Sequence, residues 1–364
     1  MSELDLRELT GAARQRLTAG QQALAAAWRQ DKHGPTLLAG RAALVDGVLQ
    51  DLWTALAMPD TCALVAVGGY GRGQLYPGSD VDLLILVPDE QHTSTECAAA
   101  PQLEQLIGLL WDIGLDIGHS VRTVDHCLDE AERDITVQTS LLEARYLTGA
   151  HALYEDFEQS YNAALQPADF FKAKQLEQAE RYAKFNDTPY SLEPNCKENP
   201  GGLRDLQVIQ WVARAAGIGD DWKDLARAGL ITAPEVRQFE RVDRMLADLR
   251  IELHLLAGRR EDRLLFDHQE KLAAAMGIAP TEAKRASEVL MQHYYRNAKL
   301  VTQLNLLVMQ VLADRLQPAQ AAAPIVIDSH FQMVRELLDV REEDIFQRLP
   351  RTILECFLLQ MQRS

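Results

Sequence analysis

The chain has 364 residues, and at roughly 100–200 residues per domain this length predicts two or three structural units. Its 37 basic residues stand against 53 acidic ones, a formal net charge of −16, and so acidic a surface repels phosphate backbones, which argues against nucleic acid as a partner. Five scattered cysteines form no CxxC pair, and we find neither a signal peptide nor a long apolar run, so we expect a cytoplasmic protein without disulfide framework, zinc site or membrane partner.

The first 123 residues are expected to mix helices with short strands. Apolar periodicity predicts two amphipathic helices over residues 3–58, separated by the turn KHGPT at 32–36. Beyond them the predicted elements are a buried strand over 61–67, a second strand over 81–87, a helix over 103–113 and a third strand over 115–123.

From Val124 to about Leu316 the sequence shows almost only helical periodicity. The longest helix is expected over 281–316, where apolar residues recur at steps of three or four. Three prolines and two glycines over 186–202 predict a long loop or a set of turns. The stretch QPAQAAAP at 317–324 predicts a linker, followed by a short apolar piece and one or two helices.

Residues 67–86, VGGYGRGQLYPGSDVDLLIL, combine a glycine-rich turn with two aspartates that open an apolar strand. Asp80 and Asp82 are two positions apart, so on a strand both carboxylates point to the same face. Two carboxylates this close repel each other, and a divalent cation removes that repulsion. Because Mg²⁺ prefers carboxylate, water and phosphate oxygens, the pair is a candidate site for Mg²⁺ together with a nucleoside triphosphate.

The glycines before the aspartates suit the phosphates of such a ligand. Without a Cβ, they let the backbone approach closely and adopt positive φ. A short helix over 70–75 would aim its N–H groups at the phosphates, and Arg72 would donate to one of them. The candidate nucleotide-binding residues of this motif are Gly68, Gly69, Tyr70, Gly71, Arg72 and Ser79.

The spacing of the motif resembles the signature of polymerase-β-like nucleotidyltransferases, in which Gly-Ser is followed at a similar distance by Asp-x-Asp. Here Gly69 precedes Asp80 by eleven residues and Asp82 by thirteen. Tyr70 stands at the position of the family's serine, which leaves only the backbone N–H for the phosphate contact of that serine. A Walker GxxxxGK[ST] sequence and a GxGxxG fingerprint are both absent from this stretch.

The same resemblance implies a third carboxylate on a neighbouring strand, acting as general base or as an extra metal ligand. Asp116 is the first candidate and Asp112 the second, and the alternative for each is a solvated surface acid. For Asp80 and Asp82 the alternative is that they only cap a turn at a strand edge. The glycine spacing and the apolar strand argue against that alternative.

A second motif, LEPNCKENPGGLRDLQVIQWVAR at 192–214, predicts a glycine turn that leads into a helix with an apolar face. Together with the first motif and with GLDIGHSVRT at 114–123, it resembles the PII-protein uridylyltransferase/uridylyl-removing enzymes of bacterial nitrogen regulation. The resemblance runs from about Leu38 to the end of the chain.

This family resemblance implies an α+β fold, mostly helical, with a small mixed-sheet polymerase-β-like nucleotidyltransferase domain and a helical bundle domain. We expect N-terminal helices over 1–60, the nucleotidyltransferase domain over 61–150, the helical domain over 151–316, and a linker with the start of a C-terminal region over 317–364. The family's hydrolytic HD domain and glutamine-sensing ACT domains would follow. Since the sequence contains no His-Asp dipeptide, we expect the transferase portion alone.

The activity that the resemblance implies is Mg²⁺-dependent transfer of UMP from UTP to a tyrosine of the signalling protein PII, with release of pyrophosphate. Asp80 and Asp82 would hold the metal, and Asp116 would assist deprotonation of the tyrosine. The second motif contributes candidates to face the nucleotide, namely Asn195, Lys197, Arg204 and Asp205. The alternative is that this loop only supports the domain contact and that Arg204 and Asp205 form local ion pairs.

Two other functions remain open at this point. An adenylyltransferase acting on another protein or on a small molecule would use the same aspartate pair. A catalytically silent module would bind PII or nucleotide without turnover, although the intact aspartates argue against it.

Overall fold

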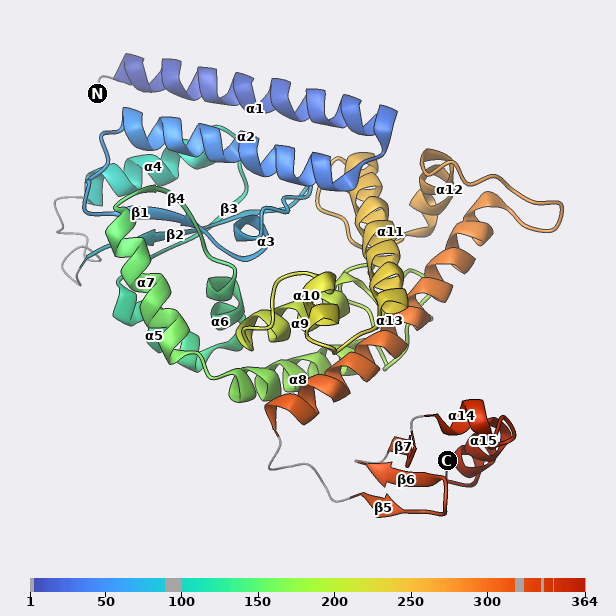
Figure 1. Ribbon diagram of the computed structural model, residues 1–364. Helices are drawn as coiled ribbons and strands as arrows, with labels where there is room; N and C mark the ends of the chain where they lie inside the picture. Colours follow the sequence, from blue (N-terminus) through green and yellow to red (C-terminus); the bar gives the residue numbers. More distant parts are fainter. Residues whose placement is uncertain (1–2, 89–99, 318–323, 335–336, 343, 364) are drawn as a thin grey trace. The chain divides into compact units, whose positions relative to one another are not determined.

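The computed structural model describes residues 3–88, 100–317, 324–334, 337–342 and 344–363 (Figure 1). The chain divides into two compact units, Met1–Met309 and Gln310–Ser364. The division falls within the long helix α13 (Ala286–Leu316). The domain boundaries expected at residues 60, 150 and 316 remain predictions.

A four-stranded mixed sheet forms the centre of the N-terminal part of the first unit. Its strands stand in the order β3-β2-β1-β4, with bounds Ala63–Ala66 for β1, Val81–Leu86 for β2, Ile117–Arg122 for β3 and Arg145–Gly149 for β4. β1 pairs antiparallel with β2 and with β4, whereas β2 and β3 run parallel. The three strands predicted from the sequence are thereby confirmed as β1, β2 and β3.

The fourth strand is a correction to the expectation of almost only helices between Val124 and about Leu316. β4 has only five residues, most of them half-buried, and it pairs with one neighbour, β1. Such a short edge strand lacks the apolar alternation that identifies a strand in a sequence. Its pairing partner β1, fully buried and apolar, decides its conformation.

Helices α1 (Glu3–Asp31), α2 (Gly34–Ala55) and α4 (Ala100–Asp112) pack their apolar residues with the sheet into one hydrophobic core. Figure 1 shows α1 lying along α2, with the sheet on the other side of α2. Lys32 at positive φ breaks the first helix, and the side chain of His33 caps the second by accepting from the Thr36 N–H. The two predicted N-terminal helices are therefore confirmed, whereas the turn predicted over 32–36 is shorter and consists of Lys32 and His33 alone.

The remainder of the first unit is helical, as predicted. Its helices are α3 (Gly68–Gly71), α5 (Val124–Arg133), α6 (Ile135–Leu142), α7 (His151–Ala164), α8 (Pro167–Lys184), α9 (Leu203–Ala215), α10 (Trp222–Arg227), α11 (Ala233–Ala257), α12 (Phe266–Ala275) and α13. α13 is the longest predicted helix, but it begins at Ala286 and not at residue 281. The Arg285 N–H, at the N-terminus of α13, has no partner within the helix and donates to the Glu288 side chain.

The loop predicted over 186–202 is confirmed as a series of turns, and its end is pressed against α13. Gly201 has φ +81°, and a Cβ there would lie 2.2 Å from the backbone oxygen of Ala298. Only glycine fits this backbone conformation and this close approach. The loop therefore reaches the start of α9 in a defined position.

A histidine on α11 connects the segment before β2 to the helical part. The Gly78 N–H donates to Nδ1 of His254 (3.1 Å), so Nε2 carries the proton and donates to Asp262 (3.0 Å). Burial lowers the pKa of His254 and keeps it neutral. Arg250 also binds Asp262 (2.6 Å) and lies over the ring of Tyr76 (4.1 Å). This cluster fixes the Tyr76–Gly78 turn, two residues from Asp80.

Besides the end of α13, the described part of the second unit contains a small antiparallel sheet and two helices. β5 (Ile325–Val326), β6 (Phe331–Val334) and β7 (Leu337–Val340) pair in sequence order, followed by α14 (Ile345–Arg348) and α15 (Thr352–Arg363). The two helices confirm the prediction, whereas the sheet was not foreseen. Most of the predicted linker at 317–324 lies outside the described residues. Within the residues that the structure describes, no helix is both long and apolar enough to cross a membrane.

The Gly201→Ala substitution is expected to lower the free energy of unfolding by about 3 kcal/mol or more, because the new Cβ meets backbone and the φ is unfavourable. Gly217→Ala is the matched control. Gly217 has φ +66° but no atom within 4 Å of the added Cβ, so it should cost only about 1 kcal/mol. Urea unfolding of both variants measures the difference, and equal losses would contradict the packing argument.

The neutral state of His254 predicts a pH-dependent stability. The unfolded chain binds a proton to this histidine at a pKa of about 6.5, whereas the folded state binds it only at lower pH. Stability is therefore expected to fall as pH drops below about 6.5, by up to about 1.4 kcal/mol per pH unit. His254→Asn should flatten this slope, since Asn does not titrate.

Urea unfolding between pH 7 and pH 5 measures both slopes. His293→Asn, at an exposed position on α13, provides the control and should leave the wild-type slope unchanged. An identical slope in wild type and His254→Asn would show that this histidine does not contribute.

Candidate active site

A cleft of about 220 Å³ lies between the glycine-rich motif and the helices of the first unit. Its lining comes from the motif itself, α6, α8, the second motif with α9, α11 and the segment after α11. The predicted site residues that line it are Gly68, Gly69, Tyr70, Arg72, Ser79, Asp80, Asp82, Lys197 and Arg204. The remaining predicted residues, Gly71, Asp116, Asn195 and Asp205, are not among the lining residues.

The glycine-rich motif turns sharply after β1 and presents its backbone to the cleft. Its helix α3 occupies Gly68–Gly71, so the short helix expected over 70–75 lies earlier and is only four residues long. Gly68 has φ +57°, and a Cβ at Gly69 would meet no atom closer than 3.9 Å. The backbone at Gly69 is therefore open to a ligand.

Two residues of the motif anchor it from behind. A Cβ on Gly71 would lie 2.0 Å from the backbone oxygen of Glu143, so this glycine is required for packing. The expectation that Gly71 approaches a ligand is therefore corrected. The Tyr70 hydroxyl donates to Asp46 of α2 (2.5 Å), which also binds Arg145 of β4 (2.8 and 3.0 Å). The Tyr70 side chain thus anchors the motif to α2.

Asp80 lies immediately before β2, and Asp82 is its second residue. Opposite Asp82 on the parallel strand β3 stands Gly118, whose missing side chain leaves room, since a Cβ there would lie 2.6 Å from Asp82 Oδ1. Burial first, and then the charge of Asp80, raises the pKa of Asp82 to about 6. The two neighbouring carboxylates therefore repel each other, and a bound cation would relieve this repulsion.

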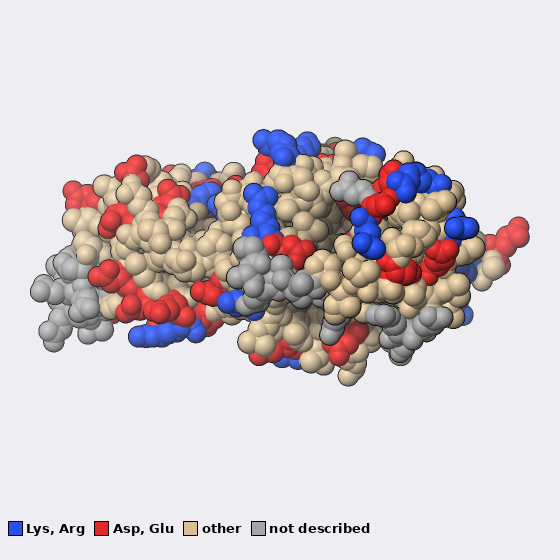
Figure 2. All heavy atoms as spheres, turned by 60° about the horizontal axis from the view of Figure 1, so that its bottom comes forward, with Lys and Arg blue, Asp and Glu red and all other residues tan. Residues whose placement is uncertain are grey.

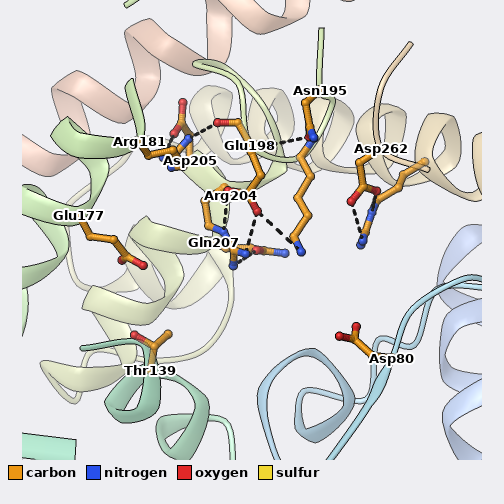
Figure 3. A network of polar contacts seen from close by, with 12 residues as sticks. Asp80, Thr139, Glu177, Arg181, Asn195, Glu198, Arg204, Asp205, Gln207 and Asp262 are labelled. Atoms are coloured by element: carbon orange, nitrogen blue, oxygen red, sulfur yellow. Dashed lines mark hydrogen bonds and ion pairs between the residues drawn. The ribbon is translucent and has the colours of Figure 1, made fainter. Parts of the chain in front are cut away.

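Positive side chains face the aspartates from the helical part. Arg260, after α11, donates to Asp80 (3.3 Å), and the charges of Lys197 and Arg260 oppose the rise in the pKa of Asp82. Figure 3 shows Asp80 on one side of the cleft and Arg204, Gln207 and Glu198 on the other. The cleft thus combines two carboxylates with basic groups from distant segments.

The third carboxylate remains a prediction. Asp116 is exposed just before β3, and its backbone oxygen accepts from the Val81 N–H (2.8 Å), which places it beside Asp80. Its charge contributes to the raised pKa of Asp82. Asp112 is exposed at the end of α4.

The carboxylates of Asp80 and Asp82 are the candidate ligands for a magnesium ion. Within the described residues, no group of three His, Cys, Asp or Glu side chains is arranged to hold a metal. Two neighbouring carboxylates, one with a raised pKa, nevertheless suit Mg²⁺, which takes few protein ligands and fills its shell with water and phosphate oxygens. The residues present therefore fit a metal that arrives with a triphosphate.

The loop of the second motif shapes the opposite wall. The Asn195 side chain accepts from the N–H groups of Lys197 (2.9 Å) and Glu198 (2.8 Å), so it supports the turn. It does not line the cleft, which corrects the expectation that it faces the nucleotide. Lys197 lines the cleft, and its closest acidic partner is Glu198 (3.7 Å). Burial, the largest cause, lowers the pKa of Lys197 to about 8, and the positive charges of Arg204 and Arg250 act in the same direction.

Arg204 occupies the first turn of α9 and is held on several sides. It binds Glu198 (2.9 Å) and Gln207 (3.0 Å), and its guanidinium group lies over the ring of Trp211 (5.1 Å). These contacts fix the group at the cleft wall with donors still available to a ligand, because a guanidinium carries five N–H groups. The local ion pairs considered in the sequence interpretation therefore coexist with a place in the cleft.

Asp205 does not face the cleft, which corrects the expectation for this residue. Its carboxylate is fully buried and accepts from Arg181, from the Tyr182 hydroxyl (2.6 Å) and from the Gly201 N–H (2.7 Å). The carboxylate thereby joins α8, α9 and the end of the loop. Its function is to hold the wall on which Lys197 and Arg204 stand.

Several lining residues were not predicted from the sequence. Lys174 of α8 is almost fully buried, pairs with Glu177, donates to Thr139 (3.3 Å) and lies over Trp211 (4.5 Å). Arg72 pairs with the buried Glu143, which also accepts from the Trp211 indole (2.6 Å). The sequence spacing could have predicted that Lys174 is buried, because it lies four residues after Phe170 and therefore on the same, buried face of α8.

These basic residues gather locally on an acidic protein. On the face shown in Figure 2, basic side chains stand in small separate groups among acidic ones. This distribution agrees with the overall charge of −16.

Comparison with known proteins gives two family matches. Residues 50–138 match a nucleotidyltransferase domain, and residues 169–309 match the GlnD PII-uridylyltransferase family. Enzymes described as bifunctional uridylyltransferase/uridylyl-removing enzyme are similar in Aromatoleum aromaticum (56% identity over 97% of this chain and 40% of the relative), Nitrosospira multiformis (50%, 96% and 40%) and Bordetella parapertussis (49%, 100% and 41%).

The chain thus spans about 40% of the length of these curated relatives. The nucleotidyltransferase match covers the sheet with Asp80 and Asp82, and the second match covers the loop with Lys197 and Arg204. The similarity therefore includes both walls of the cleft. The chain belongs to the GlnD uridylyltransferase family and carries its nucleotidyltransferase and PII-uridylyltransferase regions.

Proposed function

We propose that this chain transfers UMP from UTP to a tyrosine of the signalling protein PII and releases pyrophosphate, in the cytoplasm. The observation that carries the proposal is the cleft in which Asp80 and Asp82 face Lys197, Arg204 and Arg260. The family membership supports the choice of UTP and PII. A sheet that presents carboxylates toward basic helices is suited to phosphoryl transfer chemistry, which depends on positioning and charge stabilisation.

Mg²⁺ is the proposed cofactor, and when bound it would neutralise the triphosphate and stabilise the attacking and leaving oxygens. Asp80 and Asp82 are the residues that would hold it. Arg260 donates to Asp80 (3.3 Å) and lines the same cleft, so its guanidinium group lies within the proposed phosphate site. The pKa of Asp82, raised to about 6, leaves most of this carboxylate ionised at neutral pH, where it would serve as a metal ligand.

The phosphates are proposed to lie between the glycine turn and the second motif. The open backbone at Gly69 provides an N–H group on one side, and Lys197 and Arg204 provide positive charge on the other. These fixed donors would stabilise the charge that develops on the leaving pyrophosphate. Ser79 lines the cleft beside Asp80 and is a further candidate donor.

The PII tyrosine is proposed to attack the α-phosphorus with its hydroxyl oxygen while the bond to pyrophosphate breaks. A phenol has a pKa of about 10, so its proton needs an acceptor near neutral pH. Asp116 is the proposed acceptor, because it is exposed beside the aspartate pair.

Asp82→Asn is expected to lower turnover at least about 1,000-fold, because the amide cannot replace the carboxylate as a metal ligand. The fold should persist, since the variant removes a half-buried charge next to Asp80. Pyrophosphate release from UTP, with Mg²⁺ and purified PII, measures the effect.

ATP in place of UTP and omission of PII are the controls for this assay. Asp129→Asn is the matched variant, because Asp129 is an exposed residue of α5 that does not line the cleft, and it should keep the wild-type rate. A wild-type rate for Asp82→Asn would refute the assignment of the pair, and release with ATP only would refute uridylyl transfer.

The lowered pKa of Lys197 predicts a pH effect on UTP binding. Lys197 carries its charge below a pKa of about 8 and loses it above, so kcat/KM for UTP is expected to fall as pH rises from 7 to 9. Lys197→Arg should remove this fall, because arginine stays charged, whereas Lys197→Met should show a low and pH-independent value.

Steady-state kinetics over this pH range test the prediction. Lys172→Met removes an exposed lysine of α8 and should reproduce the wild-type profile. If Lys197→Arg falls with pH as the wild type does, another group is responsible.

A further inference from the structure

A second cavity, of about 190 Å³, lies behind the glycine-rich motif and apart from the cleft. Helices α1 and α2, the end of α11 and the Pro77–Gly78 turn form its walls. Apolar side chains dominate these walls, from Leu24 and Ala25 of α1, Leu37 of α2 and Leu255 of α11. Apolar walls with a few polar groups are typical of a site for a small organic molecule.

Arg41 of α2 lines this cavity and is only 9% exposed. Its buried Nε has no hydrogen-bond partner, and among the described residues no ion pair to its guanidinium group is found. Burial alone lowers the pKa of Arg41 to about 10, so the group remains charged at neutral pH. An unpaired buried guanidinium is costly, and such groups ordinarily have an anionic partner.

The other polar groups of the cavity do not supply that partner. Gln21 and Arg259 contribute an amide and a second guanidinium group, and none of the described residues that line the cavity is acidic. Arg259 already pairs with Glu261 (2.8 Å), which is not part of the lining. The cavity is therefore positive, with apolar walls and with free donors.

From this combination we propose that the cavity binds a small carboxylate with a short apolar body. The carboxylate would pair with Arg41, whose planar fork suits two parallel hydrogen bonds, and the apolar body would lie against the leucines. The site is distinct from the cleft and does not depend on the proposed transfer of UMP.

The position of the cavity connects it to the catalytic segment. A Cβ on Gly78 would lie 2.5 Å from the Arg260 backbone nitrogen, so the turn packs tightly against the segment that carries Arg259 and Arg260. Gly78 also binds His254, which lines the same cavity. A ligand there would contact the turn that precedes Asp80.

Butyrate is a suitable probe, and butyramide is its neutral isostere. Butyrate is expected to raise Tm saturably, by roughly 2 °C at about ten times its Kd. Butyramide and equal concentrations of sodium chloride should give no saturable rise. Arg41→Met should abolish the butyrate effect while remaining folded, because it replaces a buried unpaired charge with an apolar chain.

Two further variants separate the site from general effects. Arg29→Met removes an exposed arginine of α1 and should retain the full butyrate response. Ala25→Met fills the cavity with Arg41 intact and should abolish the response. A response that persists in Arg41→Met, a response to butyramide equal to that of butyrate, or no saturable response in the wild type would overturn the proposal.

Discussion

The repulsion between two carboxylates at the start of a buried strand is the constraint on which the rest of the first unit depends. Asp80 and Asp82 stand side by side, and burial raises the pKa of Asp82 to about 6. The chain supplies the opposing charge from far away in sequence, through Arg260 after α11 and Lys197 in the second motif. Holding these cations opposite the aspartates requires the helical part to be fixed against the sheet.

That fixation rests on buried polar contacts and on close backbone packing. His254, neutral and doubly hydrogen-bonded, ties the Gly78 turn to Asp262, and the buried Asp205 ties the second motif to α8. Glycines at positions 71, 78 and 201 let backbone segments touch where any side chain would collide. The contacts are short and directional, so each wall of the cleft has a defined place relative to the other.

Charge is distributed unevenly over this acidic protein. The cleft collects Lys174, Lys197, Arg204 and Arg260 around two aspartates, an arrangement that a metal–triphosphate complex would complete. The second cavity holds the unpaired Arg41 among apolar walls. The Tyr76–Gly78 turn contributes to both pockets, because Tyr76 lines the cleft while Pro77 and Gly78 line the second cavity.

The sequence by itself determined the local features: the two N-terminal helices, strands β1 to β3, the helical remainder and the aspartate pair with its glycine turn. These follow from periodicity, glycine placement and spacing along a few residues. Only the tertiary structure decided that β4 is a strand, that Asp205 is a buried anchor, and that Arg260 and Lys174 enter the cleft. Those outcomes depend largely on partners that lie far away in the sequence, up to 180 positions for Arg260 and Asp80, whose contacts no local pattern encodes.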